Sequence, residues 1–202
     1  EYADLKGGET VIDAYCGTGT ISLCLAKKAK RVIGIEIVKP AIEDAKKNAK
    51  KNHMGNTEFY AADTGKLMPQ LYRQGLVPDV IVMDPVRAGC SEEVLKATAG
   101  MNPKRIVYVS CNPATFARDA KILKSEGYEI KEIQPVDMFP QTMHVEVITL
   151  LSKLDSKRHI SVELPIDEMD ITCAESKATY EQIKIMYWKS MGLRCLHYIL
   201  HK

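Results

Sequence analysis

The sequence of 202 residues lacks a long hydrophobic run, a strong charge of either sign and paired cysteines. No apolar stretch reaches the roughly 18 residues that a membrane span needs, and the first residues have no signal-peptide pattern, so we expect no membrane association. The six cysteines form neither a Cys-x-x-Cys pair nor a metal-ligand spacing. This absence predicts a reduced, cytoplasmic protein without a metal ion or an iron–sulfur cluster.

Charge is nearly balanced, with 28 Lys and Arg residues against 26 Asp and Glu residues and a net charge of +2. So small an excess does not by itself indicate a nucleic-acid partner. Basic residues do cluster at 27–31 and at 46–51. A solvated helix face is the ordinary explanation of such clusters, and contact with RNA phosphates is the alternative.

Strand patterns alternate with helical patterns over the first 150 residues, and unbroken apolar runs such as 79–83 are typical of buried parallel strands. The predicted strands are 10–14, 31–36, 57–61, 79–83, 105–109, 128–136 and 145–151, and the predicted helices are 20–28, 40–52, 65–73, one from about 91 and one from 113. No helix separates the last two strands, so we expect them to pair antiparallel. The sequence therefore predicts an α/β fold with a doubly wound, mostly parallel, seven-stranded Rossmann-like sheet and an antiparallel last strand.

The character of the sequence changes after residue 154, which predicts a main domain over 1–154 and a C-terminal appendage over 155–202. The appendage has a candidate strand at 160–164 and a capping box at 172–175 that predicts a helix to about 191. The end of the chain, 185–202, lacks turn signals and a clean amphipathic period, which suggests a non-native stretch from a shifted reading frame.

The first predicted strand ends in a turn with Gly17 and Gly19, and glycines there let the backbone approach a ligand. A dinucleotide fingerprint needs a third glycine three residues later, where Ser22 stands. Glu36 lies 19 positions after Gly17, where a carboxylate that holds ribose hydroxyls is expected. The acidic residues that end the first three strands are Asp13, Glu36 and Asp63. This pattern favours S-adenosylmethionine over a dinucleotide, with plain turn and capping roles as the alternative.

Reactive side chains follow or begin three other strands. Asp84 and Arg87 come after the fourth strand, Cys111 follows the fifth, and Glu146 lies in the apolar seventh. Strand ends in an open α/β sheet converge on the ligand crevice. The helix N-terminus after Cys111 favours the thiolate, and apolar surroundings raise the pKa of a carboxyl such as Glu146, as suits a general base. An inert thiol and an Asp84–Arg87 ion pair are the alternatives.

Three blocks of the sequence resemble the signature blocks of bacterial RNA uracil-C5 methyltransferases, which make 5-methyluridine in ribosomal and transfer RNA. The blocks are Asp84–Gly89, Ser110–Asp119 and Phe139–Glu146, and the resemblance extends over about 8–154. It is closer to the 23S ribosomal RNA branch than to the transfer RNA branch. Members carry a further N-terminal RNA-binding region. The resemblance therefore implies that 1–154 is a C-terminal catalytic domain only, whose partners are RNA and that missing region.

The resemblance also implies a role for each site residue. Cys111 would be the nucleophile, Glu146 the base that removes the C5 proton, and Asp84 the group that places the target base. The residues implied for S-adenosylmethionine are Asp13, Tyr15, Gly17, Gly19, Glu36, Asp63 and Asp84. The residues implied for the RNA substrate are Arg87, Asn112, Thr142 and His144.

The chemistry of uracil explains why a thiol and a carboxylate are needed. C5 is too poor a nucleophile to accept a methyl group directly, and addition of a thiolate to C6 makes an enolate that is reactive at C5. A base then removes the C5 proton so that the thiol can leave. The target base must leave its stack, which favours single-stranded or loop RNA. RNA or DNA cytosine-C5 methylation, adenine amino-group methylation and a non-catalytic cofactor- or RNA-binding fragment are the alternative functions.

Overall fold

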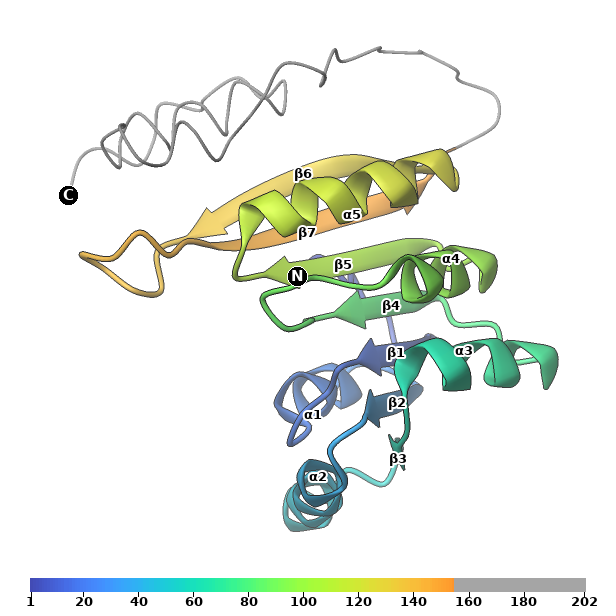
Figure 1. Ribbon diagram of the computed structural model, residues 1–202. Helices are drawn as coiled ribbons and strands as arrows, with labels where there is room; N and C mark the ends of the chain where they lie inside the picture. Colours follow the sequence, from blue (N-terminus) through green and yellow to red (C-terminus); the bar gives the residue numbers. More distant parts are fainter. Residues whose placement is uncertain (155–202) are drawn as a thin grey trace, which may run out of the picture. The chain divides into compact units, whose positions relative to one another are not determined.

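The computed structural model describes residues 1–154, in which seven strands and five helices follow one another along the chain (Figure 1). The strands are β1 (Thr10–Ala14), β2 (Arg31–Glu36), β3 (Thr57–Ala61), β4 (Val80–Met83), β5 (Arg105–Ser110), β6 (Tyr128–Val136) and β7 (Glu146–Lys153). The helices are α1 (Thr20–Ala26), α2 (Lys39–Lys51), α3 (Thr64–Arg73), α4 (Glu92–Gly100) and α5 (Pro113–Ser125). The elements predicted after residue 154 lie outside the described residues.

The strands form one sheet in the order β3-β2-β1-β4-β5-β7-β6. Strands β1 to β5 pair parallel with their neighbours, whereas β7 runs antiparallel to both β5 and β6. The predicted fold class is confirmed, including the antiparallel pairing of the last two strands. The chain proceeds from β1 outward to β3 and then returns to β4 beside β1. This reversal is the switch point at which open α/β sheets bind ligands, outside the carboxyl ends of the strands.

Helices cover both faces of the sheet because the central strands are apolar on both faces. Alternate side chains of β1 show the division: Ile12 packs in a core with Met68 of α3, Leu95 of α4 and Phe116 of α5, whereas Val11 faces the opposite side. That opposite core includes Ala26 of α1, and the buried residues of α2 form a third cluster with Phe59. The strand ends between these layers are therefore held by packing on two sides.

Most element ends agree with the sequence to within two residues. Asn112 caps α5 as predicted, because its side chain accepts a hydrogen bond from the Ala114 amide at 3.0 Å. Helix α1 ends at Ala26 instead of residue 28, because two successive amides, at 28 and 29, both donate to the Leu25 carbonyl and close the last turn. Within residues 1–154, no helix is long and apolar enough to cross a bilayer.

Candidate active site

The glycine turn after β1 has two glycines with different surroundings. Both adopt left-handed backbone angles, with φ of +52° at Gly17 and +85° at Gly19, which favour glycine. A Cβ atom on Gly19 would lie 3.1 Å from the Ala45 side chain and 3.2 Å from the Phe59 ring, so this glycine lets α1 pack closely against its neighbours. A Cβ atom on Gly17 would meet nothing within 4 Å. Gly17 therefore borders open space at the carboxyl end of β1.

Glu36 lies beside this turn, as its spacing from Gly17 predicts. Its carboxylate accepts hydrogen bonds from the Gly17 amide at 3.3 Å and from the Val38 amide at 3.0 Å. The next side chain, Ile37, is 64% exposed although it is large and apolar. The turn, a half-buried carboxylate and an exposed apolar side chain thus lie together at the ends of β1 and β2, and the sequence patterns did not indicate Ile37.

Asp13 lies beneath the turn and has no exposed surface. One carboxyl oxygen accepts a 2.5 Å hydrogen bond from the Ser22 hydroxyl, while the other, Oδ1, is buried without a hydrogen-bond partner in the described chain. Burial raises the pKa of Asp13 to about 7, and the nearby charge of Asp84 acts in the same direction. Ser22 stands where a dinucleotide-binding fingerprint has its third glycine. Its hydroxyl has a structural role here, because it donates to the Asp13 carboxyl.

Two more of the residues predicted for the cofactor, Tyr15 and Asp63, have structural partners. Tyr15 is half-buried with a left-handed φ of +71°, and its phenol forms a hydrogen bond with the thiol of Cys90. Asp63 is exposed and caps α3 by accepting a hydrogen bond from the Lys66 amide at 3.1 Å. The capping role that the sequence left open for Asp63 is thus present.

Cys111 and Glu146 come together through the pairing of β5 with β7. The antiparallel ladder ends with Ser110 paired to Val147, and Cys111 and Glu146 are the next residues beyond this pair on the two segments. Both residues are partly exposed, and the thiol of Cys111 is free. Neither side chain is enclosed in the packed core.

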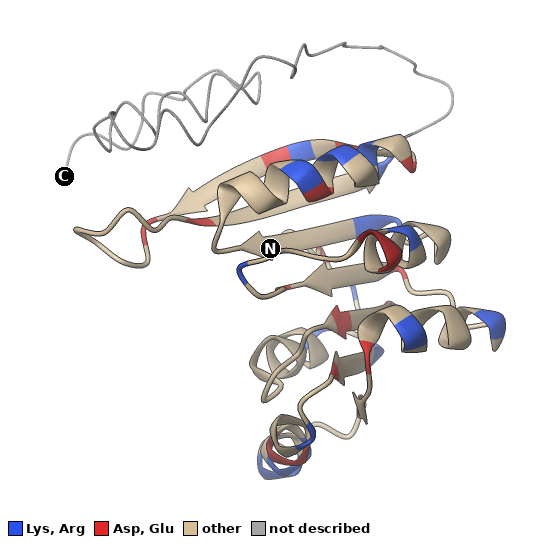
Figure 2. Ribbon diagram, viewed as in Figure 1, with Lys and Arg blue, Asp and Glu red and all other residues tan. Residues whose placement is uncertain are grey.

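Asp84 joins this pair from β4. Its charge raises the pKa of Glu146, after the larger effect of desolvation, and Arg87 acts in the opposite direction. Asp84 also raises the pKa of Asp13, so its charge acts on both the carboxyl beneath the glycine turn and Glu146. Desolvation likewise raises the pKa of Asp84 itself. Acidic residues lie at the ends of several strands as well as on the helices (Figure 2), and within residues 1–154 no direct ion pair joins Asp84 to Arg87.

The loop between β6 and β7 borders the same group. Arg87 contacts the Nδ1 atom of His144 at 3.2 Å, which links this loop to the segment after β4. Thr142 shapes the loop, because its hydroxyl donates to the Phe139 carbonyl at 2.7 Å and accepts from the His144 amide at 3.2 Å. The loop extends beyond the strand ends in Figure 1 and exposes large apolar side chains, among them Phe139 and Met143.

A family model described as tRNA (Uracil-5-)-methyltransferase matches residues 3–154. The chain belongs to the tRNA (uracil-5-)-methyltransferase family. An uncharacterized RNA methyltransferase of Bacillus cereus is 56% identical over 155 residues, 77% of this chain and 34% of that protein. One from Halalkalibacterium halodurans is 58% identical over 151 residues, 75% of this chain and 33% of that protein. The chain thus spans about a third of the length of these uracil-5-methyltransferase relatives.

Solved structures include one member of this family. The Pyrococcus abyssi tRNA (uracil-54, C5)-methyltransferase, in complex with S-adenosyl-L-homocysteine, is 38% identical with a TM-score of 0.63, over 74% of this chain and 36% of that one. An rRNA methylase from Streptococcus thermophilus is only 14% identical, with a TM-score of 0.62 over 76% of this chain and 92% of that one, and shows a shared fold alone.

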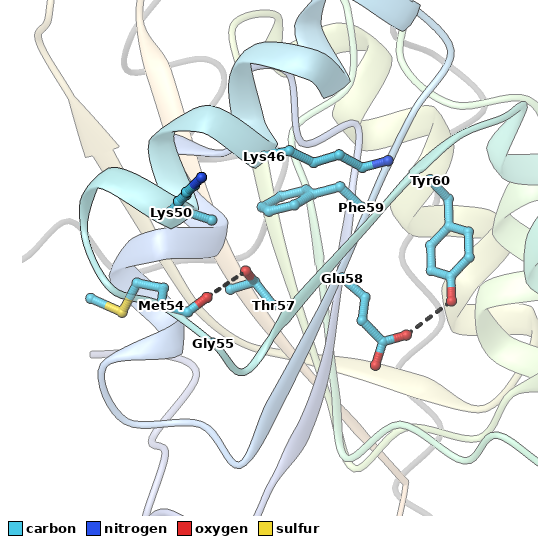
Figure 3. Close-up of a pocket in the computed structure, with 9 residues that line it drawn as sticks. Lys46, Lys50, Met54, Gly55, Thr57, Glu58, Phe59 and Tyr60 are labelled. Carbon is cyan, nitrogen blue, oxygen red and sulfur yellow. Dashed lines mark hydrogen bonds between the residues drawn. The ribbon is translucent and has the colours of Figure 1, made fainter.

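A hollow lies at the outer edge of the sheet, away from the predicted site residues (Figure 3). It measures about 480 Å³ between α2 and β3, and it contains none of the predicted site residues. Lys46 and Lys50 of the second basic cluster border it, and its one carboxylate, Glu58, is bound to Arg31 at 2.7 Å. Lysines beside an edge strand are a common protection against pairing with other strands.

Sequence reasoning assigned no role to Arg118 and Asp119, although the structure gives both many contacts. Asp119 is fully buried on the apolar face of α5, in helical spacing with Phe116, Ala120 and Leu123. An acidic residue in the middle of such a face is a signal for a buried partner. The hydrogen-bond partners of Asp119 include the Cys90 amide in the loop after β4 and the Tyr108 hydroxyl of β5, and residue spacing could not identify them.

Proposed function

We propose that this chain transfers a methyl group from S-adenosylmethionine to C5 of a uridine in RNA. The observation that carries the proposal is the pairing of β5 with β7, whose last pair, Ser110 with Val147, is adjacent to Cys111 and Glu146, together with the charge of Asp84 that acts on Glu146. A thiol and a base of raised pKa around one space are what uracil-C5 chemistry requires. Family membership and a solved relative in complex with S-adenosyl-L-homocysteine support the same reading.

The residues at the ends of β1 and β2 fit the methyl donor. Gly17 borders open space, Glu36 is in reach of ribose hydroxyls beside it, and exposed Ile37 offers an apolar surface for a flat adenine ring. The unpartnered Oδ1 atom of Asp13 is the kind of buried group that a bound ligand or an ordered water completes. When bound there, S-adenosylmethionine would supply the electrophilic methyl group that C5 accepts.

Cys111 begins the reaction by adding its sulfur to C6 of the target uracil. The C5–C6 double-bond electrons move toward O4 and give an enolate whose C5 is nucleophilic. Cys111 immediately precedes Asn112, the N-cap of the 13-residue helix α5, so its sulfur lies at the start of that helix. Asp84 and Arg87, at the neighbouring strand end, would hold the polar edge of the base in place.

Glu146 ends the reaction as the general base. Once C5 has its methyl group, the carboxylate takes the remaining C5 proton, the C5–C6 double bond forms again and the bond from sulfur to C6 breaks. Desolvation and the charge of Asp84 raise the pKa of Glu146, which makes it a stronger base than an ordinary carboxylate. Because the base must be ionised, we expect the rate to rise with pH through a pKa above the usual 4.5.

The RNA would reach this space with its target base turned out of the stack. The exposed apolar side chains of the loop between β6 and β7 suit contact with unstacked bases. We infer 23S ribosomal RNA in the cytoplasm as the substrate, because the signature blocks resemble that branch, while the names of the matched family and of the Pyrococcus relative refer to tRNA. The length that relatives have beyond the matched third would contribute further RNA contacts.

A covalent trap tests the proposal. RNA that contains 5-fluorouridine should form a denaturation-resistant adduct with the chain in the presence of S-adenosylmethionine, because fluorine at C5 cannot leave as a proton does. Cys111→Ala should form none, and both 23S ribosomal and transfer RNA fragments are offered. Absence of an adduct in a wild-type chain that binds S-adenosylhomocysteine would overturn the proposal. An adduct with 5-fluorocytidine RNA alone would assign cytosine instead.

A further inference from the structure

Asp119 of α5 forms hydrogen bonds with three segments: the loop after β4, the strand β5 and α5 itself. It has no exposed surface, and its Oδ2 atom accepts hydrogen bonds from the Cys90 amide at 2.7 Å and from the Tyr108 hydroxyl at 2.6 Å. Its Oδ1 atom accepts two more from Arg118, from Nε at 2.8 Å and from Nη2 at 2.7 Å. A buried carboxylate with four donors is fully satisfied and holds its partners firmly.

Arg118 and Thr115 form further hydrogen bonds between α5 and the segment after β4. Arg118 Nη2 also donates to the backbone carbonyls of Ala88 at 2.9 Å and Cys90 at 3.2 Å. The hydroxyl of Thr115 donates to the carbonyl of Arg87 at 3.2 Å. Side chains of one helix therefore hold three carbonyls of the segment 84–90, which carries Asp84 and Arg87.

Gly89 shows how closely this segment lies against α5. Its φ is +75°, and a Cβ atom there would lie 2.5 Å from Asp119 Oδ2, 2.7 Å from Arg118 Nη2 and 3.2 Å from Thr115 Cβ. Only glycine avoids both the backbone strain and these contacts. The close approach is thus built into the sequence of the segment.

The same helix begins directly after the nucleophile. Asn112 caps α5 and Cys111 precedes it, so a displacement of α5 against the segment 84–90 would displace the thiol against Asp84 and Arg87. We propose that Arg118 and Asp119 are positioning residues that fix Cys111 relative to Asp84 and Arg87 for addition to the uracil ring. This inference rests on the proposed function, and it adds residues that touch neither the substrate nor the cofactor.

The test uses Arg118→Gln, because the Arg118 side chain is 53% exposed and its loss leaves the core intact. Arg31→Gln is the control for loss of an arginine: Arg31 donates two hydrogen bonds, at 2.7 and 2.9 Å, to the exposed carboxylate of Glu58 on β3, away from the segment 84–90. Thr115→Val, which removes the hydroxyl that donates to the carbonyls of Arg87 at 3.2 Å and Asn112 at 3.0 Å, is the second variant. Hydrogen exchange of the amides of 86–90, the rate of adduct formation with 5-fluorouridine RNA and the affinity for S-adenosylhomocysteine are measured.

In Arg118→Gln we expect the amides of 86–90 to exchange at least about tenfold faster. The rate of adduct formation should fall by between about 10- and 100-fold, because small displacements of reacting groups have effects of that size. Affinity for S-adenosylhomocysteine should stay within about twofold, and Arg31→Gln should change none of the three, while Thr115→Val should move the first two in the same direction by less.

Two results would overturn the proposal: unchanged exchange, or faster exchange with an unchanged rate of adduct formation, which would leave the contacts a purely structural role. Failure of the wild-type chain to form any adduct would instead overturn the proposed function, and the positioning role with it. The two failures are distinguishable because only the second appears in the wild-type chain.

Discussion

The side chains at the carboxyl ends of the strands have different hydrogen-bond partners in the two halves of the sheet. In the half formed by β1, β2 and β3, the carboxyl groups of Asp13, Glu36 and Asp63 all accept hydrogen bonds from the protein itself. In the half formed by β4, β5 and β7, the described chain gives no hydrogen-bond partner to the side chains of Asp84, Cys111 or Glu146. In the proposed function, the first half would thus serve as the binding surface, and the second would keep its reactive groups available.

The difference has a physical reason. A carboxylate that shapes a binding turn performs best when backbone and hydroxyl donors fix it, because no reorganisation is then needed when the ligand arrives. A nucleophile and a base must exchange partners during the reaction, so fixed partners would hinder them. In the second half, rigidity comes from behind the reactive groups, through the contacts of Arg118 and Asp119 with the segment 84–90.

The largest effect should come from Cys111→Ala. Methyl transfer to RNA should fall by about 10⁴-fold or more, because no other group supplies the covalent step. The affinity for S-adenosylhomocysteine, measured by calorimetry, should stay unchanged, since the binding half is intact. Cys24→Ala, at an exposed and free thiol, is the control that should keep full activity. Methyl transfer by Cys111→Ala at more than one per cent of the wild-type rate would contradict the proposed division of roles between the two halves of the sheet.

Glu146→Gln should lower turnover by between about 10² and 10⁴-fold, as expected for loss of a general base. Cys111 remains able to add to C6, so ordinary, unfluorinated RNA should accumulate as a methylated covalent adduct on the protein. Gel mobility under denaturing conditions and mass spectrometry detect it. Glu129→Gln, on the adjacent strand β6 and paired with Lys131, serves as the control. Slow turnover without an adduct would contradict a role in proton removal.

Glu36→Gln should act on the other half. Its amide oxygen can still accept a backbone hydrogen bond, but the charged acceptor for ribose hydroxyls is lost, which corresponds to about 10- to 100-fold weaker binding of S-adenosylhomocysteine. Exchange of the uracil C5 hydrogen with solvent should persist, because it needs only addition by Cys111 and proton removal by Glu146. Glu43→Gln, at an exposed position of α2, is the comparison variant. Equal loss of exchange and of cofactor binding would argue against separate halves.

Asp13→Asn tests the buried carboxyl beneath the turn. Because burial raises its pKa from 3.8 to about 7, its unfavourable ionisation is absent below about pH 4 and complete above about pH 7. The folded chain should therefore lose stability as pH rises across this window, and the neutral variant should lose less. We expect the melting temperature of Asp13→Asn to exceed that of the wild type by a few degrees at pH 8 and by less at pH 5. The exposed-site variant Asp44→Asn should show no such dependence.

The smallest effect should follow charge reversal at the outer edge, in a Lys46→Glu and Lys50→Glu double variant. These lysines lie beside the hollow between α2 and β3, away from the loops that border Cys111. RNA affinity and its salt dependence should change by less than about twofold, whereas Arg87→Gln should reduce the salt slope by about one. A steep loss of affinity in the double variant would extend the RNA surface across the binding half.

Much of the fold could be predicted from sequence because each buried parallel strand is an apolar run and each turn carries its own signal. β1, β2, β3 and β6 have the predicted bounds, and Asn112 caps α5 as expected. The link between Glu36 and Gly17 also followed from spacing, since the first strand–helix–strand unit has nearly fixed dimensions. The unpartnered oxygen of Asp13 and the hydrogen-bond partners of Asp119 could not be predicted, because both depend on groups from several elements.

The sequence by itself determined which elements form and which chemical groups stand at their ends, because periodicity, caps and glycine turns are local. Only the tertiary structure decided that Cys111 and Glu146 both adjoin the last pair of the β5–β7 ladder and that the charge of Asp84 acts on both Glu146 and Asp13. Those neighbours are separated by tens of residues along the chain, and the ladder between β5 and β7 together with the order β1-β4-β5 brings them to one edge. Strand order and register follow from packing of the whole domain, which no local pattern contains.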